Sequence, residues 1–125
     1  MIARDLRLRS PRDFERARAE GRGWSNALLV AVVRPNELPS NRYGFAVGKR
    51  VGNAVARNRA KRLMREAARP LHPQLRQGHD VLFIARNSFG LQTSFGDVAE
   101  AMHELMTRSG LLRPGAPGPD DTAGQ

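Results

Sequence analysis

Apolar and polar positions recur with helical spacing in three segments of the chain. The first is residues 11–20, where a Pro in the first turn and the Gly that follows the segment mark its two ends. The second is residues 53–69, which contain neither Gly nor Pro and stop at Pro70. The third runs from residue 94 to residue 108, and its apolar side chains share one helical face: Phe95, Val98, Met102, Leu105 and Met106. We therefore predict three helices.

Three shorter segments have the composition of strands. Residues 27–33 and 80–86 are mostly apolar and rich in Val, Leu and Ile, which is typical of strands that are buried on both faces. Residues 42–48 carry aromatic and β-branched side chains and follow turn-forming residues at 39–41. We predict that strands 27–33 and 42–48 form a hairpin, within an α/β (α+β) two-layer sandwich of one small sheet covered by helices.

Length and composition limit the protein to one small domain. Its 125 residues allow a single core, and the apolar fraction of 40% is modest for a globular chain. We expect residues 1–112 to form this domain and residues 113–125, which are rich in Pro and Gly, to be a disordered tail. The absence of Cys excludes disulfide scaffolds, thiol nucleophiles and Cys-based zinc sites.

The net charge of +9 indicates a polyanionic partner. A nucleic acid fits better than a membrane surface, because no helical segment sets large apolar residues opposite its basic ones. No apolar run approaches the roughly 20 residues that span a bilayer, and the first five residues lack the apolar core of a signal peptide. We expect a cytoplasmic protein that binds nucleic acid and no membrane.

The second predicted helix and the residues just before it carry most of this charge. Residues 49–69 include eight Lys and Arg and a single acid, Glu66. On a helical wheel the cations fall on one side and the small or apolar residues, mostly Ala, on the other. A solvated helix face usually interleaves Glu with Lys or Arg, whereas Arg57, Lys61 and Arg65 repel one another four residues apart. The excess of Arg suits phosphate and base contacts in folded RNA, although composition alone leaves both RNA and DNA open.

Two glycines, Gly48 and Gly52, flank the basic pair Lys49 and Arg50. They would allow the backbone to approach a phosphate closely. They would equally serve to end a strand and permit a turn. The sequence leaves both interpretations open.

Residues 42–67 resemble the signature of the bacterial ribonuclease P protein family. They read RYGFAVGKRVGNAVARNRAKRLMREA, and the family hallmark is an Arg-Asn-Arg segment preceded by Gly-Asn-Ala-Val. Residues 8–14 with Gly21 are similar to the family's N-terminal Asp-Phe helix, and residues 82–86 are similar to its last strand. Together these stretches span residues 8–108.

The resemblance implies a four-stranded sheet in which the Arg-Asn-Arg helix forms an unusual left-handed β-α-β crossover, whereas general rules favour a right-handed one. The fourth strand would come from a different division of residues 24–35. The implied function is that of an auxiliary subunit of an endoribonuclease, whose catalytic RNA performs metal-assisted phosphodiester hydrolysis with Mg²⁺ bound mainly by the RNA. The protein would bind that RNA and the 5′ leader of precursor tRNA, one protein per RNA, and would itself hold no catalytic residue and no metal ligand.

The resemblance also implies which residues bind each partner. Phe14 lines the cleft for the leader, and family members often place two more aromatic residues there, where this chain has Arg18 and Val32. Leader binding is then expected to rely more on charge, because stacking of a base on an aromatic ring contributes about 1 to 3 kcal/mol. Trp24 or Tyr43 could substitute, but we expect strand and core roles for them. The residues expected to contact the catalytic RNA, or to support metal ions bound between the two, are Lys49, Arg50, Asn53, Arg57, Asn58, Arg59, Lys61, Arg62 and Arg65.

Two other functions compete with this one. In an intrinsic nuclease, His72, His79 and His103 would act as general acid and base, but their spacing suggests no metal site and we expect them to be solvent-exposed. A general RNA-binding or ribosomal-type protein with no role in cleavage would show the same charge and helix pattern. Within the sequence, only the Gly-Asn-Ala-Val and Arg-Asn-Arg block separates such a protein from a ribonuclease P subunit.

Overall fold

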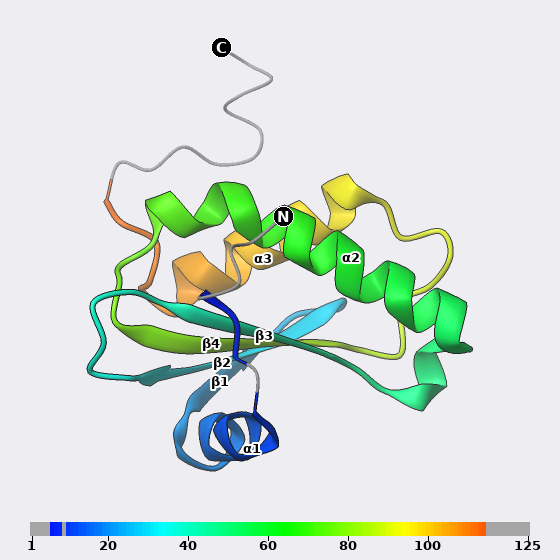
Figure 1. Cartoon of the computed structure of the whole chain (residues 1–125). Coiled ribbons are helices and arrows are strands. Elements are labelled where there is room, and N and C mark those ends of the chain that lie inside the picture. Colours follow the sequence, from blue (N-terminus) through cyan, green and yellow to red (C-terminus); the bar gives the residue numbers. More distant parts are fainter. Residues whose placement is uncertain (1–5, 9, 115–125) are drawn as a thin grey trace.

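The computed structural model describes residues 6–8 and 10–114 (Figure 1). Its elements are α1 (Pro11–Glu20), β1 (Arg22–Ser25), β2 (Leu29–Pro35), β3 (Arg42–Val47), η2 (Lys49–Val51), α2 (Ala54–Leu71), η3 (His72–Gln74), β4 (His79–Ala85) and α3 (Phe95–Arg108), where η marks a turn of 3₁₀ helix. None of the described helices is long and apolar enough to cross a membrane. Most of the tail that we predicted to be disordered, residues 115–125, lies outside the described residues.

The three predicted helices are confirmed, and side chains cap the start of each one. Ser10 Oγ accepts a hydrogen bond from the N–H of Asp13 at 3.1 Å, and Asn53 Oδ1 accepts one from the N–H of Ala56 at 3.0 Å. At α3, Ser94 and the first-turn acid Asp97 form a reciprocal capping box. Each cap satisfies backbone donors that would otherwise lack a partner in the first turn.

The end of α2 differs from the prediction, because the helix continues one residue past Pro70. Pro70 lacks a backbone N–H and so costs the last turn one hydrogen bond. Leu71, the next residue, is only 7% exposed and belongs to the hydrophobic core. Burial of Leu71 therefore offsets the defect, and the helix ends after the proline.

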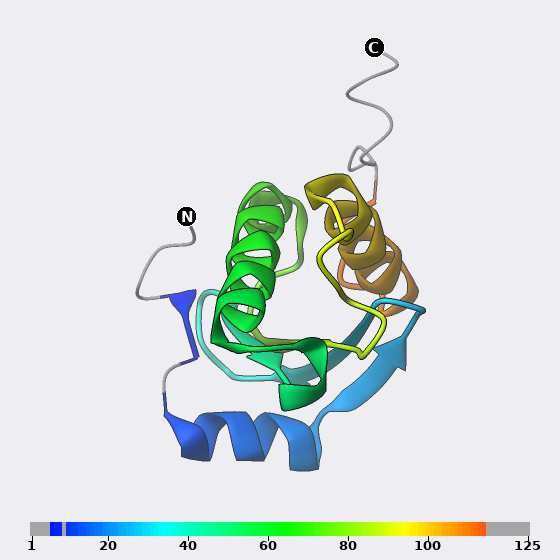
Figure 2. The same ribbon diagram turned by 90° about the vertical axis from the view of Figure 1, so that its right-hand side faces the viewer.

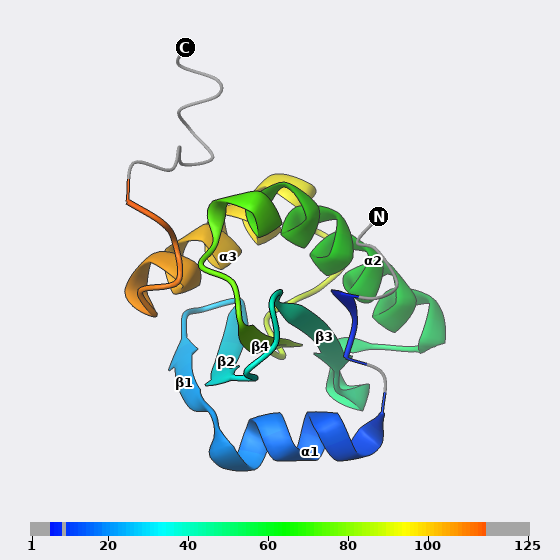
Figure 3. The ribbon, with the colours of Figure 1, turned by 60° about the vertical axis from the view of Figure 1, so that its left-hand side comes forward.

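The strands form one sheet in the order β1-β2-β4-β3, as Figure 3 shows. The fourth strand comes, as expected, from dividing the segment around residues 24–35, since β1 and β2 pair as an antiparallel hairpin. The predicted hairpin of β2 with β3 is wrong. Instead β4 lies between them, antiparallel to β2 and parallel to β3.

The burial of β4 explains why it takes the central position. Val81, Leu82 and Phe83 are each at most 1% exposed, so both faces of the strand are covered. An edge position would leave one row of backbone donors and acceptors on β4 unpaired. The hairpin was predicted from neighbouring segments alone. Such a prediction takes no account of a strand more than 30 residues away that competes for the position beside β2.

Helices cover both faces of the sheet (Figure 2). α2 and α3 lie on one face over Leu29, Ala31, Val81 and Phe83, where most of the hydrophobic core is found. α1 lies across the opposite face and adds a partial further layer to the predicted sandwich. The outer side of α2 and the sheet face beside α1 are therefore two separate surfaces of the molecule.

α1 approaches the sheet closely because glycines stand at two of its contacts. A Cβ at Gly44 of β3 would lie 2.8 Å from Phe14 Cε1, so the missing side chain makes room for the Phe14 ring. A Cβ at Gly21, just after α1, would lie 2.6 Å from both the Ala17 carbonyl oxygen and Val32 Cγ1. Ala17 itself is fully buried. Small residues thus set the distance between α1 and the sheet.

We predict that Gly21→Ala lowers the free energy of unfolding by about 1 to 3 kcal/mol, because the added methyl overpacks the contact between α1 and β2. Gly23→Ala in β1 is the matched control, since its added Cβ would meet only the Ala31 carbonyl oxygen, at 3.9 Å. Urea unfolding of both variants and of the unmodified protein measures the difference. Equal stability of the two variants would contradict the close packing described above.

Candidate nucleic-acid interface

The two faces of α2 are divided as its sequence predicts. Six side chains on one side are buried against the sheet and α3: Ala60, Leu63, Met64, Ala67, Ala68 and Leu71. The cations occupy the remaining surface, together with the exposed Asn58. Arg62 and Arg69 are exposed, and Arg57, Lys61 and Arg65 are half-buried. Half-burial is typical of long basic side chains that lay their methylene groups along the protein and keep the charge in water.

The cations of α2 and η2 have no acidic partner among the described residues. The ion pairs found among the described residues join Arg16, Arg34 and Arg42 to acids in α1 and β4. None of these ion pairs involves a residue of α2 or η2. Glu66, the one acid on α2, is exposed and makes no ion pair with any residue that the structure describes. Like charges therefore face water along one side of a rigid helix, and a bound polyanion would relieve their repulsion.

The turn before α2 presents two more cations. Lys49 and Arg50 are exposed in η2. Gly52 has a φ of 150°, and a Cβ there would lie 2.9 Å from Ala56 Cβ, so the turn requires glycine at this position. A Cβ at Gly48 would meet nothing within 4 Å. The interpretation of Gly52 as a turn residue is therefore supported, while Gly48 leaves its backbone open to solvent.

Three of the predicted RNA contacts also hold the protein together. Arg57 donates a hydrogen bond to the Gly52 carbonyl oxygen at 3.1 Å, and the Asn53 side-chain oxygen caps α2. Arg59 donates to the carbonyl oxygens of Gly90 at 3.3 Å and Thr93 at 2.8 Å. Arg59 thus fastens the loop between β4 and α3 to α2, a role that sequence reasoning missed because it depends on a segment 30 residues away.

The three candidate leader-binding residues lie on α1 or on β2 beneath it, but their exposure differs. Phe14 is half-buried against Gly44, Val32 is only 9% exposed, and Arg18 is exposed on α1 one turn after Phe14. Of these residues, Phe14 and Arg18 offer surface to a ligand. Val32 supports α1 from below.

A row of apolar side chains on the same sheet face was missed by sequence reasoning. Val30 of β2, Ile84 of β4 and Ala46 of β3 are paired across neighbouring strands and are all half-buried. Val30 and Ala46 lie two residues from Val32 and Gly44, which face α1, so they are on the same face of the sheet. Ile84 is paired with both and shares that face. We call Val30, Ala46 and Ile84 the open row. The alternation of exposure along each strand could have revealed it only after the register was known.

Neither aromatic residue considered as a substitute lies on this face. Tyr43 is 1% exposed within the core, and its hydroxyl contacts Asn41 Nδ2 at 3.2 Å and His72 Nδ1 at 2.7 Å. Burial raises the pKa of Tyr43 to about 12, although the hydrogen bond from Asn41 lowers it. Trp24 is half-buried against the core and carries the Arg22 guanidinium 5.1 Å above its ring. The expected core and strand roles are confirmed.

The prediction of solvent-exposed histidines is wrong. His72, His79 and His103 are all half-buried, in η3, β4 and α3 respectively. They lie in three different elements, and the described residues contain no group of three or more His, Asp or Glu that could hold a metal ion. The error arose because His72 and His79 flank the polar connection 73–78, whereas both pack at the ends of structured elements.

Asp80 is a buried carboxylate at the start of β4, and three side chains surround it. It accepts two hydrogen bonds from Arg42 at 2.9 Å each and one from Asn36 Nδ2 at 3.0 Å, and Arg34 lies 3.3 Å away. Burial alone would raise the pKa of Asp80, but the hydrogen bonds and the two positive charges outweigh it and hold the pKa below its usual value. The hydrogen bond to Asp80 likewise raises the pKa of Arg42.

The same two arginines connect Asp80 to α1. Arg42 lies 3.5 Å from Asp13, and Arg34 lies 3.4 Å from Glu20. These acids stand near the two ends of α1, so the charges orient the helix across the sheet. This network holds α1, and with it Phe14 and Arg18, on the sheet face that carries the open row.

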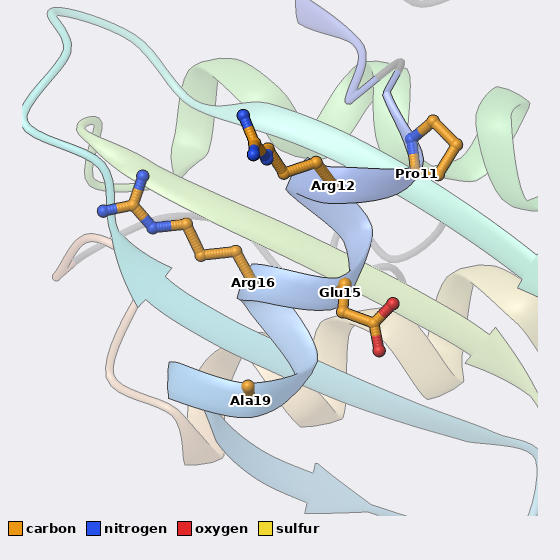
Figure 4. Close-up of a pocket in the computed structure, with 5 residues that line it drawn as sticks. All are labelled: Pro11, Arg12, Glu15, Arg16 and Ala19. Carbon is orange, nitrogen blue, oxygen red and sulfur yellow. The ribbon is translucent and has the colours of Figure 1, made fainter.

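One further hollow lies on the outer side of α1, away from both surfaces (Figure 4). Its volume is about 650 Å³, and it is lined by Pro11, Arg12, Glu15, Arg16 and Ala19. All five residues come from one helix, and the side chains bring no catalytic or metal-binding group together. We assign it no function.

Comparison with known proteins identifies the fold and the family that it represents. A family model described as Ribonuclease P matches residues 2–110. The ribonuclease P protein component of Herpetosiphon aurantiacus is 44% identical over 110 residues, which cover 88% of this chain and 89% of that protein. The corresponding protein of Roseiflexus castenholzii is 39% identical over 112 residues, or 90% of this chain and 92% of that one.

Solved structures show the same fold. The RNase P protein of Staphylococcus aureus superposes with a TM-score of 0.78 at 25% identity, over 86% of this chain and 98% of that chain. The RNase P protein of Thermotoga maritima gives a TM-score of 0.74 at 32% identity, over 82% of this chain and 96% of that chain. The four-stranded sheet with three helices is therefore the fold of these proteins.

We predict that Asp80→Asn destabilises the protein by about 3 kcal/mol at pH 7. This value is at the low end for breaking a buried ion pair, because Arg34 and Arg42 would still form their ion pairs with Glu20 and Asp13. Since the pKa of Asp80 is lower in the folded than in the unfolded state, its contribution is present above about pH 4 and is lost as the pH falls through the folded pKa. Urea unfolding at pH 7 and pH 3 should show the stability gap between variant and unmodified protein narrowing in acid. A gap independent of pH would rule out the proposed role of the ionised carboxylate.

A matched control for this measurement is Glu15→Gln, which removes an exposed carboxylate from α1. Glu15 takes part in none of the ion pairs found among the described residues. Its replacement should change the free energy of unfolding by no more than about 0.5 kcal/mol.

Proposed function

This chain belongs to the ribonuclease P protein family, and we propose that it binds the catalytic RNA of that enzyme through α2 and the 5′ leader of precursor tRNA beside α1. The family match, the curated relatives and the solved structures support the subunit role rather than a general RNA-binding or ribosomal-type role. The observation that carries the RNA contact is the cationic side of α2, which has no acidic partner among the described residues.

The RNA-binding surface that we propose extends from η2 along α2. Exposed Lys49 and Arg50 stand at one end, and a helical arrangement of cations continues from there at a spacing suited to successive phosphates. The direct contacts in this proposal are Lys49, Arg50, Arg57, Asn58, Lys61, Arg62 and Arg65. Asn53 and Arg59 act mainly through the protein, because their side chains already hold the start of α2 and the loop after β4.

We propose that the leader lies on the sheet face next to α1. The open row supplies an apolar floor for nucleobases, Phe14 supplies one aromatic ring, and Arg18 supplies a charge for the backbone. Val32 lies too deep to stack on a base, because it is 9% exposed beneath α1. Electrostatic attraction therefore carries more of the leader affinity here than in a surface with three aromatic rings.

The reaction in this proposal is phosphodiester hydrolysis carried out by the RNA. Mg²⁺ prefers oxygen ligands such as phosphates and water, so the RNA would bind most of it. The protein's contribution is to screen phosphate charge along α2 and to orient the leader relative to the RNA. We propose one protein per RNA and action in the cytoplasm.

We predict that the protein stimulates precursor-tRNA cleavage by its cognate catalytic RNA at low Mg²⁺, and that Arg62→Ala, Arg65→Ala greatly reduces this effect. Loss of two phosphate contacts should also reduce the slope of log affinity against log salt by about two units. The charge-matched control is Arg12→Ala, Arg16→Ala on the outer side of α1, which should behave as the unmodified protein. Cleavage assays and equilibrium binding over a salt series measure both effects.

The same assay separates the three functions. No stimulation by the unmodified protein would favour the general RNA-binding alternative. Cleavage by the protein alone would show an intrinsic nuclease. Equal loss in both charge variants would mean that net charge, not the α2 surface, drives binding.

For the leader, we predict that Arg18→Phe exchanges a charge contact for a stacking contact worth at least about 1 kcal/mol. At high salt, where the charge contact is screened, the variant should therefore bind precursor tRNA about fivefold or more tighter than the unmodified protein. Its affinity should also become less dependent on salt by about one unit of slope. Affinities of the RNA–protein complex for precursor tRNA with and without a leader provide the measurement and its control. An equal gain for the leaderless RNA would place Arg18 outside the leader site.

A further inference from the structure

Exposed apolar side chains gather at one corner of the molecule, beside the start of α2. The described residues include four exposed large hydrophobic residues: Val55 and Leu91 at 76%, and Phe95 and Leu38 at 44%. Three of them belong to the first turn of α2 or to the segment that leads into α3. Only Leu38 lies elsewhere, in the connection between β2 and β3.

Arg59 holds the loop that carries Leu91 and leads to Phe95 against the first half of α2. Its guanidinium group donates to the carbonyl oxygens of Gly90 and Thr93 on either side of Leu91. Val55 lies one helical turn before Arg59 and shares its side of the helix. Figure 1 shows the loop after β4 running alongside the first half of α2. We call Val55, Leu91 and Phe95 the apolar corner.

The loop that carries the corner is well anchored. Phe89 is 2% exposed and belongs to the core, which holds one end of the loop. Thr93 closes a turn with Gly90 through its side-chain oxygen at 3.0 Å and its backbone N–H at 3.1 Å. The capping box of Ser94 then starts α3 with Phe95 as its first residue. Phe95 is 44% exposed, although the sequence predicted it on the buried face of α3.

The chemistry around the corner favours one kind of occupant. Apolar side chains beside cations that make no ion pair with any described residue suit a group with a flat apolar face and a nearby negative charge. An unpaired nucleotide has both. The exposed Arg62 stands two turns after Val55 on the neighbouring surface of α2. The corner is continuous with the surface that we propose for the catalytic RNA.

We propose that the apolar corner extends the RNA interface by receiving an unpaired base of the RNA whose phosphates lie along α2, and that Arg59 is the positioning residue that holds it there. This inference rests on the proposed RNA binding by α2. It assigns base contact to Phe95 and Leu91, with Val55 at the edge. Arg59 acts through the loop, and the direct phosphate contacts remain on the other cations.

The test is equilibrium binding of the full-length protein to its cognate catalytic RNA over a salt series. Leu91→Ala, Phe95→Ala should weaken binding on the order of tenfold at every salt concentration, because a stacking contact is lost. The slope against salt should stay unchanged, because no phosphate contact is lost. Leu38→Ala is the matched control and should bind as the unmodified protein. Leu91→Ala alone, at a residue that is 76% exposed, guards against an effect of Phe95 on folding.

A second variant isolates the role of Arg59. Arg59→Lys keeps the charge, but a single ammonium group cannot reproduce the planar fork that reaches two carbonyl oxygens. We expect it to weaken binding without changing the salt slope, as the apolar variants do. Arg12→Lys, at an exposed arginine on the outer side of α1, is its control and should have little effect. Full affinity of Arg59→Lys would overturn the positioning role.

The outcomes separate this inference from the proposed function. Tight, salt-dependent binding by the unmodified protein with no loss in either apolar variant would overturn the apolar corner alone. A reduced salt slope in the apolar variants would also overturn it, since phosphate contacts would then be involved. Weak binding by the unmodified protein itself would overturn the proposed function.

Discussion

The arrangement of this protein depends on one constraint, the complete burial of β4. Val81 and Phe83 project toward α2 and α3, and Leu82 projects toward α1, so the strand is stable only where helices cover both faces of the sheet. Its central position separates β2 from β3 and makes α2 the connection between two parallel neighbours. The two proposed RNA surfaces therefore lie on opposite sides of one sheet, and each is held by its own layer of helices.

Two groups of the described basic side chains differ in their partners, one that forms ion pairs beside α1 and one on α2 that forms none with the described acids. On the α1 side, Asp80 gathers Arg34 and Arg42, and the acids of α1 complete the network. Compensated charge there fixes the angle of α1 and with it the surface proposed for the leader. On α2 the cations have no acidic partner among the described residues, which costs stability in the free protein and leaves their charge for the polyanion that we propose. In this proposal the same residue types serve folding on one face and binding on the other.

The Arg-Asn-Arg segment combines both uses within three residues. Asn58 is exposed, whereas Arg57 and Arg59 are half-buried and donate to backbone carbonyl oxygens of the turn before α2 and the loop before α3. Two of the three residues in this motif therefore stabilise the segments that flank α2, in addition to their proposed contact with RNA. Because Arg59 holds the loop before α3, a change at Arg59 alters the shape of the surface as well as its charge.

The sequence by itself determined the helices, their caps, the two faces of α2 and the family, because these depend on neighbours within a few residues along the chain. Through the family resemblance it also assigned Phe14 and Arg18 to the proposed leader cleft. Only the tertiary structure decided the strand order, the open row, the half-burial of the histidines and the structural role of Arg59. Each of these depends on contacts between segments far apart in sequence, such as Arg59 with Thr93 or β3 with β4, and such contacts are selected by competition for burial across the whole core.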